Sequence, residues 1–392
     1  MRKGNSNPDR KADSSWLSAE RISEASGRNM RRRRPRFGRK RTFGALNNMK
    51  TYKHLWEEYI SKENFQLAYH NSLKGKGRQK TVIEFNQHPE ENLEAVRQLV
   101  LSGQFHTSPY REKIIYEPKK RTIYKLPYCP DRIVQHAMVN VLKPIFVRLS
   151  MENSYACIEG RGQIKASQKC SEYVRKYDYC LKGDIRKFYY NIDQEILSED
   201  MHRIIWDERF MADVDDVIFS YPGGNNCPIG NLTSQWFGNF YLRKLDNFIL
   251  HEIKPKGYLR YCDDFLLFDD DKAKLQRARE AIEAFLWTEL KLEYSKAEIF
   301  KTACQGVDFC GYRHFKHYVL VRKRTSKRLI KRYRDIQEAL ESGKGGASIQ
   351  RMRGQVASGH GLMKHACTAH LRKNVHHYEL AERLNIKIKR KE

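Results

Sequence analysis

Three aspartates, each placed where an apolar run stops, are the residues best suited to chemistry in this sequence. Asp184 follows the run 179–181, and Asp263 with Asp264 separates two further apolar runs. Carboxylates that different strands bring side by side repel one another and therefore need cations. Two Mg²⁺ ions held by such oxygens can activate a 3′-hydroxyl and stabilise a leaving pyrophosphate, which is two-metal nucleotidyl transfer. Taken singly, each acid is more often an ordinary turn residue.

The elements around these aspartates are predicted from apolar periodicity and turn residues. Runs 257–262 and 265–268 predict a β-hairpin with the two acids at its turn. A loop after 222–224 precedes a helix marked by apolar residues within 236–245, and a further helix follows over 271–288. A strand pair is predicted within 306–321.

Upstream, a helical pattern begins at Tyr52, and a second helix over 89–101 stops at Gly103. Two short strands are predicted at 114–116 and 122–124, and Asp131 is expected to cap the helix that follows it. Strands that alternate with helices and hairpins predict an α+β body, with α/β as the alternative. The last 70 residues are predicted to be mostly helical and basic.

The charge of the chain is uneven. It has 74 Lys and Arg residues against 47 Asp and Glu residues, a net charge of +27. Residues 1–45 carry 14 basic and 4 acidic residues, and residues 321–392 carry 19 and 6. A nearly neutral body with two basic ends is typical of a protein that binds nucleic acid. The alternative is a basic surface that only keeps the chain soluble.

Composition excludes several classes of protein. Hydrophobic residues make up 40% of the chain, too many for a disordered chain, and no run of 18 apolar residues predicts a membrane helix. The first 30 residues lack an apolar signal core, and the nine Cys form no CxxC pair. We therefore expect reduced cytoplasmic thiols and no disulfide framework. The spacing of His360, His365, Cys367 and His370 fits no common zinc finger.

A series of short motifs carries a family resemblance. In chain order they are KR at 120–121, LP at 126–127, DR at 131–132, DIRKFY at 184–189, YCDD at 261–264, SK at 295–296 and GVDFCGY at 306–312. Their order and spacing resemble those of reverse transcriptases, with YCDD matching the family's YxDD signature. The resemblance implies an α+β right-hand polymerase, with a basic extension at 1–48, fingers and palm at 49–320 and a basic helical thumb at 321–392.

One further motif resembles a narrower group. Residues 229–235 read IGNLTSQ, where retroviral and group II intron enzymes usually have Gln in place of Ile229 and Pro in place of Gln235. This form, together with SGH at 358–360, is similar to reverse transcriptases of diversity-generating retroelements, within the superfamily of group II intron and retron enzymes. The resemblance implies that a template-repeat RNA is copied into adenine-mutagenised cDNA.

The resemblance also implies cofactors and partners. The cofactors would be two Mg²⁺ ions, with Mn²⁺ as a substitute. The partners would be template RNA, the primer and its cDNA, dNTPs and a pentameric basic accessory variability protein, with no membrane. The setting would be the bacterial cytoplasm, with the element encoded by the bacterium or by a phage.

By the same resemblance, Asp184 and Asp263 would ligate both metals, with help from the Ile185 carbonyl and with Asp264 beside them. Lys296 would protonate the pyrophosphate leaving group, although a plain solvated lysine fits the sequence almost as well.

A second set of residues would bind the nucleotide. Arg121 would pair with the triphosphate, and Tyr189 would stand under the incoming sugar and favour dNTPs. Gly230 would let the backbone approach the template–dNTP pair, and Gln235 belongs to the same motif. Ile229 cannot form the hydrogen bonds that Gln forms there, so mispairs should meet a lower penalty. An exposed strand face for Arg121 and a core aromatic for Tyr189 are the alternatives.

Two other functions stay open. The first is another bacterial reverse transcriptase, of retron, group II intron or phage-defence type; the absence of a maturase or endonuclease domain after the thumb makes the intron type less favoured. The second is a non-catalytic RNA-binding scaffold, against which the intact Asp184, Asp263 and Asp264 argue.

Overall fold

The computed structural model describes residues 51–116, 120–342 and 349–388. The basic extension predicted at 1–48 lies outside the described residues. Helices and antiparallel strands are mixed along these ranges, which confirms the α+β class. No helix within them is both long and apolar enough to span a membrane.

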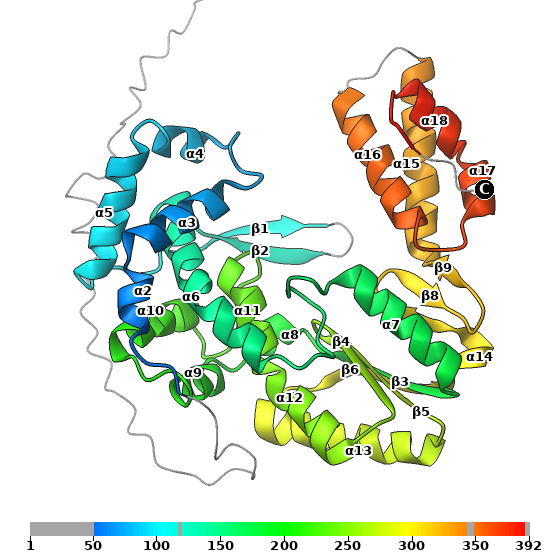
Figure 1. Ribbon diagram of the computed structural model, residues 1–392, viewed down its shortest axis with the longest axis horizontal. Helices are drawn as coiled ribbons and strands as arrows, with labels where there is room; N and C mark the ends of the chain where they lie inside the picture. The colour runs from blue at the N-terminus through cyan, green and yellow to red at the C-terminus, as the bar shows by residue number, and fades with distance from the viewer. Residues whose placement is uncertain (1–50, 117–119, 343–348, 389–392) are drawn as a thin grey trace, which may run out of the picture. The chain divides into compact units, whose positions relative to one another are not determined.

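The largest sheet is antiparallel, with the strand order β4-β5-β3-β6. Its strands are β3 (Tyr179–Ile185), β4 (Gly257–Tyr261), β5 (Asp264–Asp269) and β6 (Tyr294–Lys301). Helix α7 (Gln163–Lys176) packs on one face of this sheet and α13 (Lys272–Leu290) on the other (Figure 1). The strand that leads to Asp184, the hairpin and the following helix are therefore confirmed.

The alternation of side chains along β3 and β5 divides them between the two faces of the sheet. Cys180 and Phe268 are opposite each other and belong to the core beneath α7. Asp184 and Asp264 stand four positions further along the same pair of strands. Because side chains repeat with a period of two, both carboxylates lie on the α7 face, beyond the apolar core.

Gly183 sits between the core and the carboxylates and faces the α13 side of the sheet. It is opposite Phe265, and a Cβ at this position would come within 2.4 Å of the Phe265 ring. The ring therefore occupies the place of a side chain on β3, and only glycine fits there.

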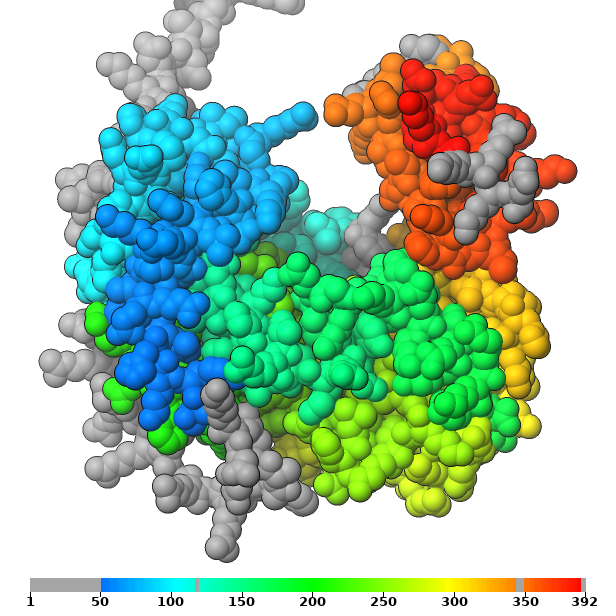
Figure 2. Space-filling model, in the orientation of Figure 1, coloured from blue at the N-terminus to red at the C-terminus, as the bar shows by residue number. Residues whose placement is uncertain are grey.

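The first part of the described chain is helical. Its helices are α2 (Leu55–Tyr59), α3 (Lys62–Leu73), α4 (Lys80–Phe85), α5 (Pro89–Leu101) and α6 (Ile133–Leu149). The apolar α6 is buried along most of its length and contacts α3, α2 and α5. Figure 2 shows the blue and cyan residues of this region as a continuous surface. The helices predicted near Tyr52 and over 89–101 are confirmed.

A two-stranded antiparallel ribbon joins α5 to α6 and consists of β1 (Arg111–Ile115) and β2 (Arg121–Lys125), as predicted. The predicted helix cap at Asp131 is wrong. Asp131 lies within the π-helical turn η1 (Tyr128–Arg132), and its carboxylate accepts the N–H of Ser108 at 2.8 Å. The buried carboxylate therefore fixes the chain before β1 and leaves α6 without a side-chain cap.

Short helices connect β3 to β4. They are α8 (Phe188–Asn191), α9 (Gln194–His202), α10 (Glu208–Phe219), α11 (Leu232–Tyr241), α12 (Arg243–Phe248) and the π-helical turn η2 (Ile249–Ile253). The helix predicted within 236–245 begins earlier and is divided at Leu242 into α11 and α12.

The chain after β6 forms a second sheet and a helical module. The elements are α14 (Thr302–Gln305), β7 (Val307–Phe309), β8 (Tyr312–His314), β9 (Val319–Val321), α15 (Lys323–Glu341), α16 (Ile349–Met363), α17 (Ala369–Asn374) and α18 (His377–Arg383). The strand pair predicted within 306–321 is thus three strands. The helices share their own core, around Leu329, Tyr333 and Val356.

Candidate active site

Strand register brings the predicted acids into one row at the end of the largest sheet. Asp184 on β3 is directly opposite Asp264 on β5, and its other neighbour is Lys296 on β6. Asp263 lies in the two-residue turn that joins β4 to β5, since Tyr261 and Asp264 are the last pair of that hairpin. The third carboxylate thus stands at the tip of the hairpin, beside the row.

The electrostatics of the row favour binding of a cation. Burial raises the pKa of the Asp263 carboxyl, the charge of Asp184 adds to this effect, and the charge of Arg121 opposes it. Burial likewise raises the pKa of Asp264 to about 6, with Asp184 and Asp263 adding to it. The Oδ1 atom of Asp264 is buried and has no hydrogen-bond partner. Each feature would be relieved by a bound cation.

The row does not by itself enclose an ion. Nowhere in the described ranges do three or more His, Cys, Asp or Glu side chains gather closely enough to surround a metal. Mg²⁺ sites commonly use one or two carboxylates, with water and substrate phosphates as the remaining ligands. The donor set, all oxygen, fits Mg²⁺ or Mn²⁺ and not a soft metal.

Lys182 is a site residue that the sequence did not single out. Its ammonium lies 3.4 Å from Asp264 Oδ2 and donates to the Asp308 carbonyl oxygen at 2.5 Å. It stands two residues before Asp184 and therefore on the same face of β3, which is the signal that could have identified it. Asp308 in turn accepts a hydrogen bond from Arg322 Nε at 2.6 Å. A series of polar contacts through Asp308 thus links the row to Arg322, at the start of α15.

Arg121 and the IGNLTSQ motif meet at β2. Arg121, at the start of β2, is exposed and close enough to Asp263 to lower the pKa of its carboxyl. The Tyr124 N–H donates to the Ile229 carbonyl at 2.8 Å. Gly230 has a φ of +124°, and a Cβ there would lie 2.7 Å from the Tyr124 carbonyl oxygen. Only glycine lets the motif approach the strand this closely.

Tyr189 is held beside the hairpin turn. Its carbonyl accepts the N–H of Cys227 at 2.7 Å, and a Cβ on Gly238 would lie 3.0 Å from its ring. Burial raises the pKa of its hydroxyl, and the charges of Cys262 and Asp263 add to the effect, which places the ring near the YCDD turn. Gln235 on α11 is exposed and accepts a hydrogen bond from Cys157 Sγ at 3.6 Å.

Lys296 is in the row by register, yet its ammonium is paired elsewhere. It lies 2.7 Å from Glu298 on the same strand, and its side chain is 66% exposed. Ile185 ends β3 and pairs with Tyr294 on β6, after a register shift that follows Asp184. His360, one of the residues with unusual spacing, hydrogen-bonds to His377 at 3.0 Å.

Comparison with known proteins identifies the class. Residues 116–314, which contain the whole row, match the family described as reverse transcriptase (RNA-dependent DNA polymerase). The match spans half of the chain, so the chain belongs to the reverse transcriptase family. The protein is an RNA-directed DNA polymerase.

Two relatives are similar over parts of their length. Protein YkfC of Escherichia coli (strain K12) is 26% identical over 286 residues, which are 59% of this chain and 72% of that protein. Nuclear intron maturase 4, mitochondrial, of Arabidopsis thaliana is 23% identical over 163 residues, 39% of this chain. The matched part is 20% of the maturase.

Proposed function

We propose that the chain is the reverse transcriptase of a diversity-generating retroelement, which copies a template-repeat RNA into adenine-mutagenised cDNA. The observation that carries the proposal is the place of Ile229. Its carbonyl is bonded to Tyr124 on the same strand that bears Arg121, so its aliphatic side chain belongs to the nucleotide-binding region. An aliphatic residue offers no hydrogen bond to the nascent base pair. A mispair is therefore penalised less here than in an enzyme with Gln at this position.

The fold supports a right-hand arrangement for this activity. Residues 49–320 would form the fingers and palm, with the β3–β6 sheet as the palm, and residues 321–392 the thumb. The exposed basic residues of α15 would hold the backbone of the template–primer duplex through its phosphates.

In the reaction, Asp184 and Asp263 would hold two Mg²⁺ ions, or Mn²⁺ in their place, together with the Ile185 carbonyl. When bound, the ions supply Lewis-acid stabilisation to the attacking 3′-hydroxyl and the leaving pyrophosphate. Asp264, neutralised in part by Lys182, stands beside them.

The other site residues act on the nucleotide. Arg121 binds its triphosphate. Tyr189 stands under the sugar and excludes the ribose 2′-hydroxyl. Gly230 and Gln235 line the template–dNTP pair. The Lys296 ammonium separates from Glu298 and then gives a proton to the leaving pyrophosphate.

The partners follow from the same proposal. They are the template RNA, the primer with its cDNA, dNTPs and a pentameric basic accessory protein. The reaction takes place in the cytoplasm of the bacterium that carries the element or its phage.

Primer extension on RNA with Mg²⁺ and dNTPs, followed by sequencing of the cDNA, tests this proposal. The isolated chain and the chain with its native RNA and accessory protein are assayed in parallel. We expect errors concentrated opposite template A, and fewer of them in Ile229→Gln. Ile83→Gln, which changes an exposed isoleucine on α4 in the same way, is the control.

One observation favours a second candidate. The intron maturase relative supports a reverse transcriptase of group II intron or retron type. Extension with errors spread evenly over the four template bases, unchanged by Ile229→Gln, would keep the polymerase but favour a retron or phage-defence enzyme. No cDNA under any condition would favour the RNA-binding scaffold.

A further inference from the structure

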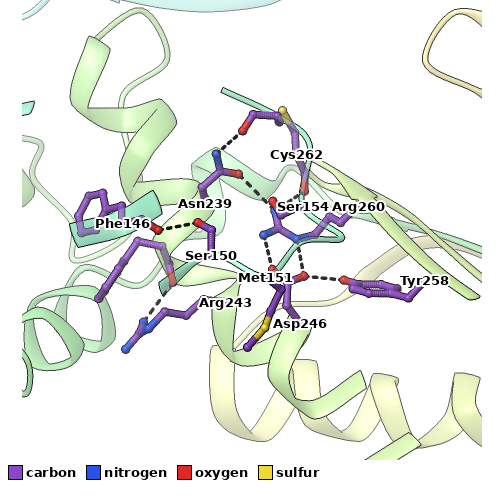
Figure 3. A network of polar contacts seen from close by, with 12 residues as sticks. Phe146, Ser150, Met151, Ser154, Asn239, Arg243, Asp246, Tyr258, Arg260 and Cys262 are labelled. Atoms are coloured by element: carbon purple, nitrogen blue, oxygen red, sulfur yellow. Dashed lines mark hydrogen bonds and ion pairs between the residues drawn. The ribbon is translucent and has the colours of Figure 1, made fainter. Parts of the chain in front are cut away.

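A buried ion pair joins Arg260 and Asp246, close to Cys262 of the YCDD turn (Figure 3). Arg260, on β4, is 1% exposed, and Asp246, on α12, is fully buried. Arg260 is opposite Phe265 in the hairpin, so its side chain is on the α13 face.

The guanidinium of Arg260 donates four hydrogen bonds. Nε donates to Asp246 Oδ1 at 2.7 Å and Nη2 donates to Oδ2 at 2.5 Å, which is a bidentate pair. Nη1 donates to the Cys262 carbonyl at 3.0 Å and to Asn239 Oδ1 at 3.3 Å. Tyr258 completes the network by donating to Asp246 Oδ1 at 2.6 Å.

The bond to Cys262 reaches the hairpin turn itself. Cys262 has a φ of +56°, a left-handed conformation that a non-glycine residue adopts only where its surroundings hold it. Its carbonyl belongs to the peptide unit that leads to Asp263. Arg260 thus fixes the backbone next to that carboxylate.

The stability of the fold gives no strong reason for this pair. Taking two charges out of water costs about as much as their attraction returns, and apolar replacements of both partners are often neutral. What an apolar pair cannot supply is a donor aimed at the Cys262 carbonyl. Because an apolar pair could match the stability but not this hydrogen bond, we infer that the network serves the geometry of the turn.

We propose that Arg260 and Asp246 are positioning residues, which set the place of the Asp263 carboxylate by holding the Cys262 carbonyl against the α11–α12 segment. This inference rests on the proposed metal-binding role of Asp263. Asp246 orients the guanidinium, Arg260 holds the turn, and Asn239 ties Arg260 to α11. The Arg260 side chain lies on the α13 face, away from the carboxylate row, so it acts through the turn.

The test compares the Arg260→Lys variant and the Arg260→Met, Asp246→Leu double variant with the wild-type protein. The matched control is Arg243→Met. Arg243 is a buried arginine on α12, the helix that also carries Asp246, but it pairs with Asp200 and does not reach the turn. Single-turnover dNTP incorporation is measured against Mg²⁺ and dNTP concentration. Denaturant unfolding and template–primer affinity are measured alongside.

We expect incorporation to slow by about 10²-fold in both variants, the effect of a misplacement of about 1 Å. The Mg²⁺ concentration for half-maximal rate should rise several-fold, while the KM for dNTP and the duplex affinity stay within about twofold. A structural role alone would lower the active fraction without moving the Mg²⁺ curve.

Asp263→Asn is assayed beside these variants. If it is inactive while folded Arg260→Lys keeps the wild-type rate and Mg²⁺ curve, the positioning role is wrong and the metal site stands. If Arg243→Met shifts the Mg²⁺ curve equally, the positioning role is also wrong. An active Asp263→Asn would overturn both. Should the double variant not fold, Arg260→Lys decides.

Discussion

Lys182 shows how a single residue tunes the candidate active site. Its ammonium serves two acceptors at once, the carboxylate of Asp264 and the carbonyl of Asp308. The strand patterns predict where Asp184 and Asp263 stand, because each follows an apolar run. They do not predict the contacts of Lys182, because its two partners are distant in the sequence. Asp264 is 82 residues away and Asp308 is 126 residues away. Likewise, register alone suggests that Lys296 faces Asp184, whereas its ammonium is paired with Glu298.

The variant Lys182→Met tests this residue. We expect a loss of about 1–3 kcal/mol in unfolding free energy, because a buried carboxylate and a carbonyl both lose their partner. The rate of dNTP incorporation should fall as well. Lys165→Met, which changes an exposed lysine on α7, serves as the control. Equal stability of the two variants in urea would contradict the pairing.

At the scale of elements, local patterns predict most of the fold. Alternating apolar runs predict β3 and the β4–β5 hairpin, and the helix over 89–101 is found at those residues. Asp131 was expected as a cap because local sequence favours one there; a distant contact with Ser108 takes the carboxylate instead. The third strand, β9, depends on pairing with β8, which no local pattern specifies.

Gly183 gives a prediction for the packing between β3 and β5. Gly183→Ala would force a methyl group into the Phe265 ring, since the added Cβ lies 2.4 Å from it. Overpacking of this kind costs about 1–3 kcal/mol, and the displaced strands should slow catalysis by moving Asp184. Denaturant unfolding measures the loss. Gly354→Ala, which adds a methyl to α16 with nothing within 4 Å, should be neutral or slightly stabilising.

His314 gives a prediction for the contact between β8 and α7. Its ring is fully buried, with Nδ1 2.8 Å from Ser171 Oγ, and burial lowers its pKa to about 4, against the opposing effects of the Phe309 backbone and the Asp308 charge. The folded state therefore keeps His314 neutral, whereas the unfolded chain binds a proton below about pH 6.5. The neutral His314 therefore makes its whole contribution to the free energy of unfolding above that pH, and this contribution decreases as the pH falls.

When the pH is lowered from 7.5 to 5.5, protonation of His314 in the unfolded chain should decrease the free energy of unfolding by about 1.4 kcal/mol. The variant His314→Gln should lose this part of the pH dependence, as measured by urea unfolding at both values. His317→Gln, at an exposed position, should keep it. A pH dependence that is the same in all three proteins would refute the assignment.

At the scale of the whole molecule, charge is the dominant feature. The chain carries a net charge of +27, and α15 presents exposed basic residues on the side away from its buried Leu329, Tyr333 and Ile336. The composition predicts a polyanion partner, and the reverse transcriptase family makes that partner a nucleic acid. Which residues meet the duplex depends on the helix face, and that is known only from the fold.

Neutralising Lys327, Arg328 and Lys331 with Gln should weaken binding of an RNA–DNA duplex at every sequence. Each lost phosphate contact should reduce the slope of log K against log salt by about 0.7–0.9. The control is a variant with Lys254, Lys272 and Arg277 changed to Gln, at exposed positions outside α15. Filter binding or anisotropy at several salt concentrations measures the slopes. Equal slopes for both variants would exclude α15 from the interface.

The most direct test of the account concerns Asp263. Single-turnover incorporation of one dNTP on an RNA template is compared between wild type, Asp263→Asn and Asp178→Asn, which removes an exposed carboxylate just before β3. Because metal ions supply several kcal/mol of transition-state stabilisation, Asp263→Asn should be slower by at least about 10²-fold. Its template–primer affinity should stay unchanged, and Asp178→Asn should match wild type. An Asp263→Asn protein that extends the primer at the wild-type rate would contradict the proposed site.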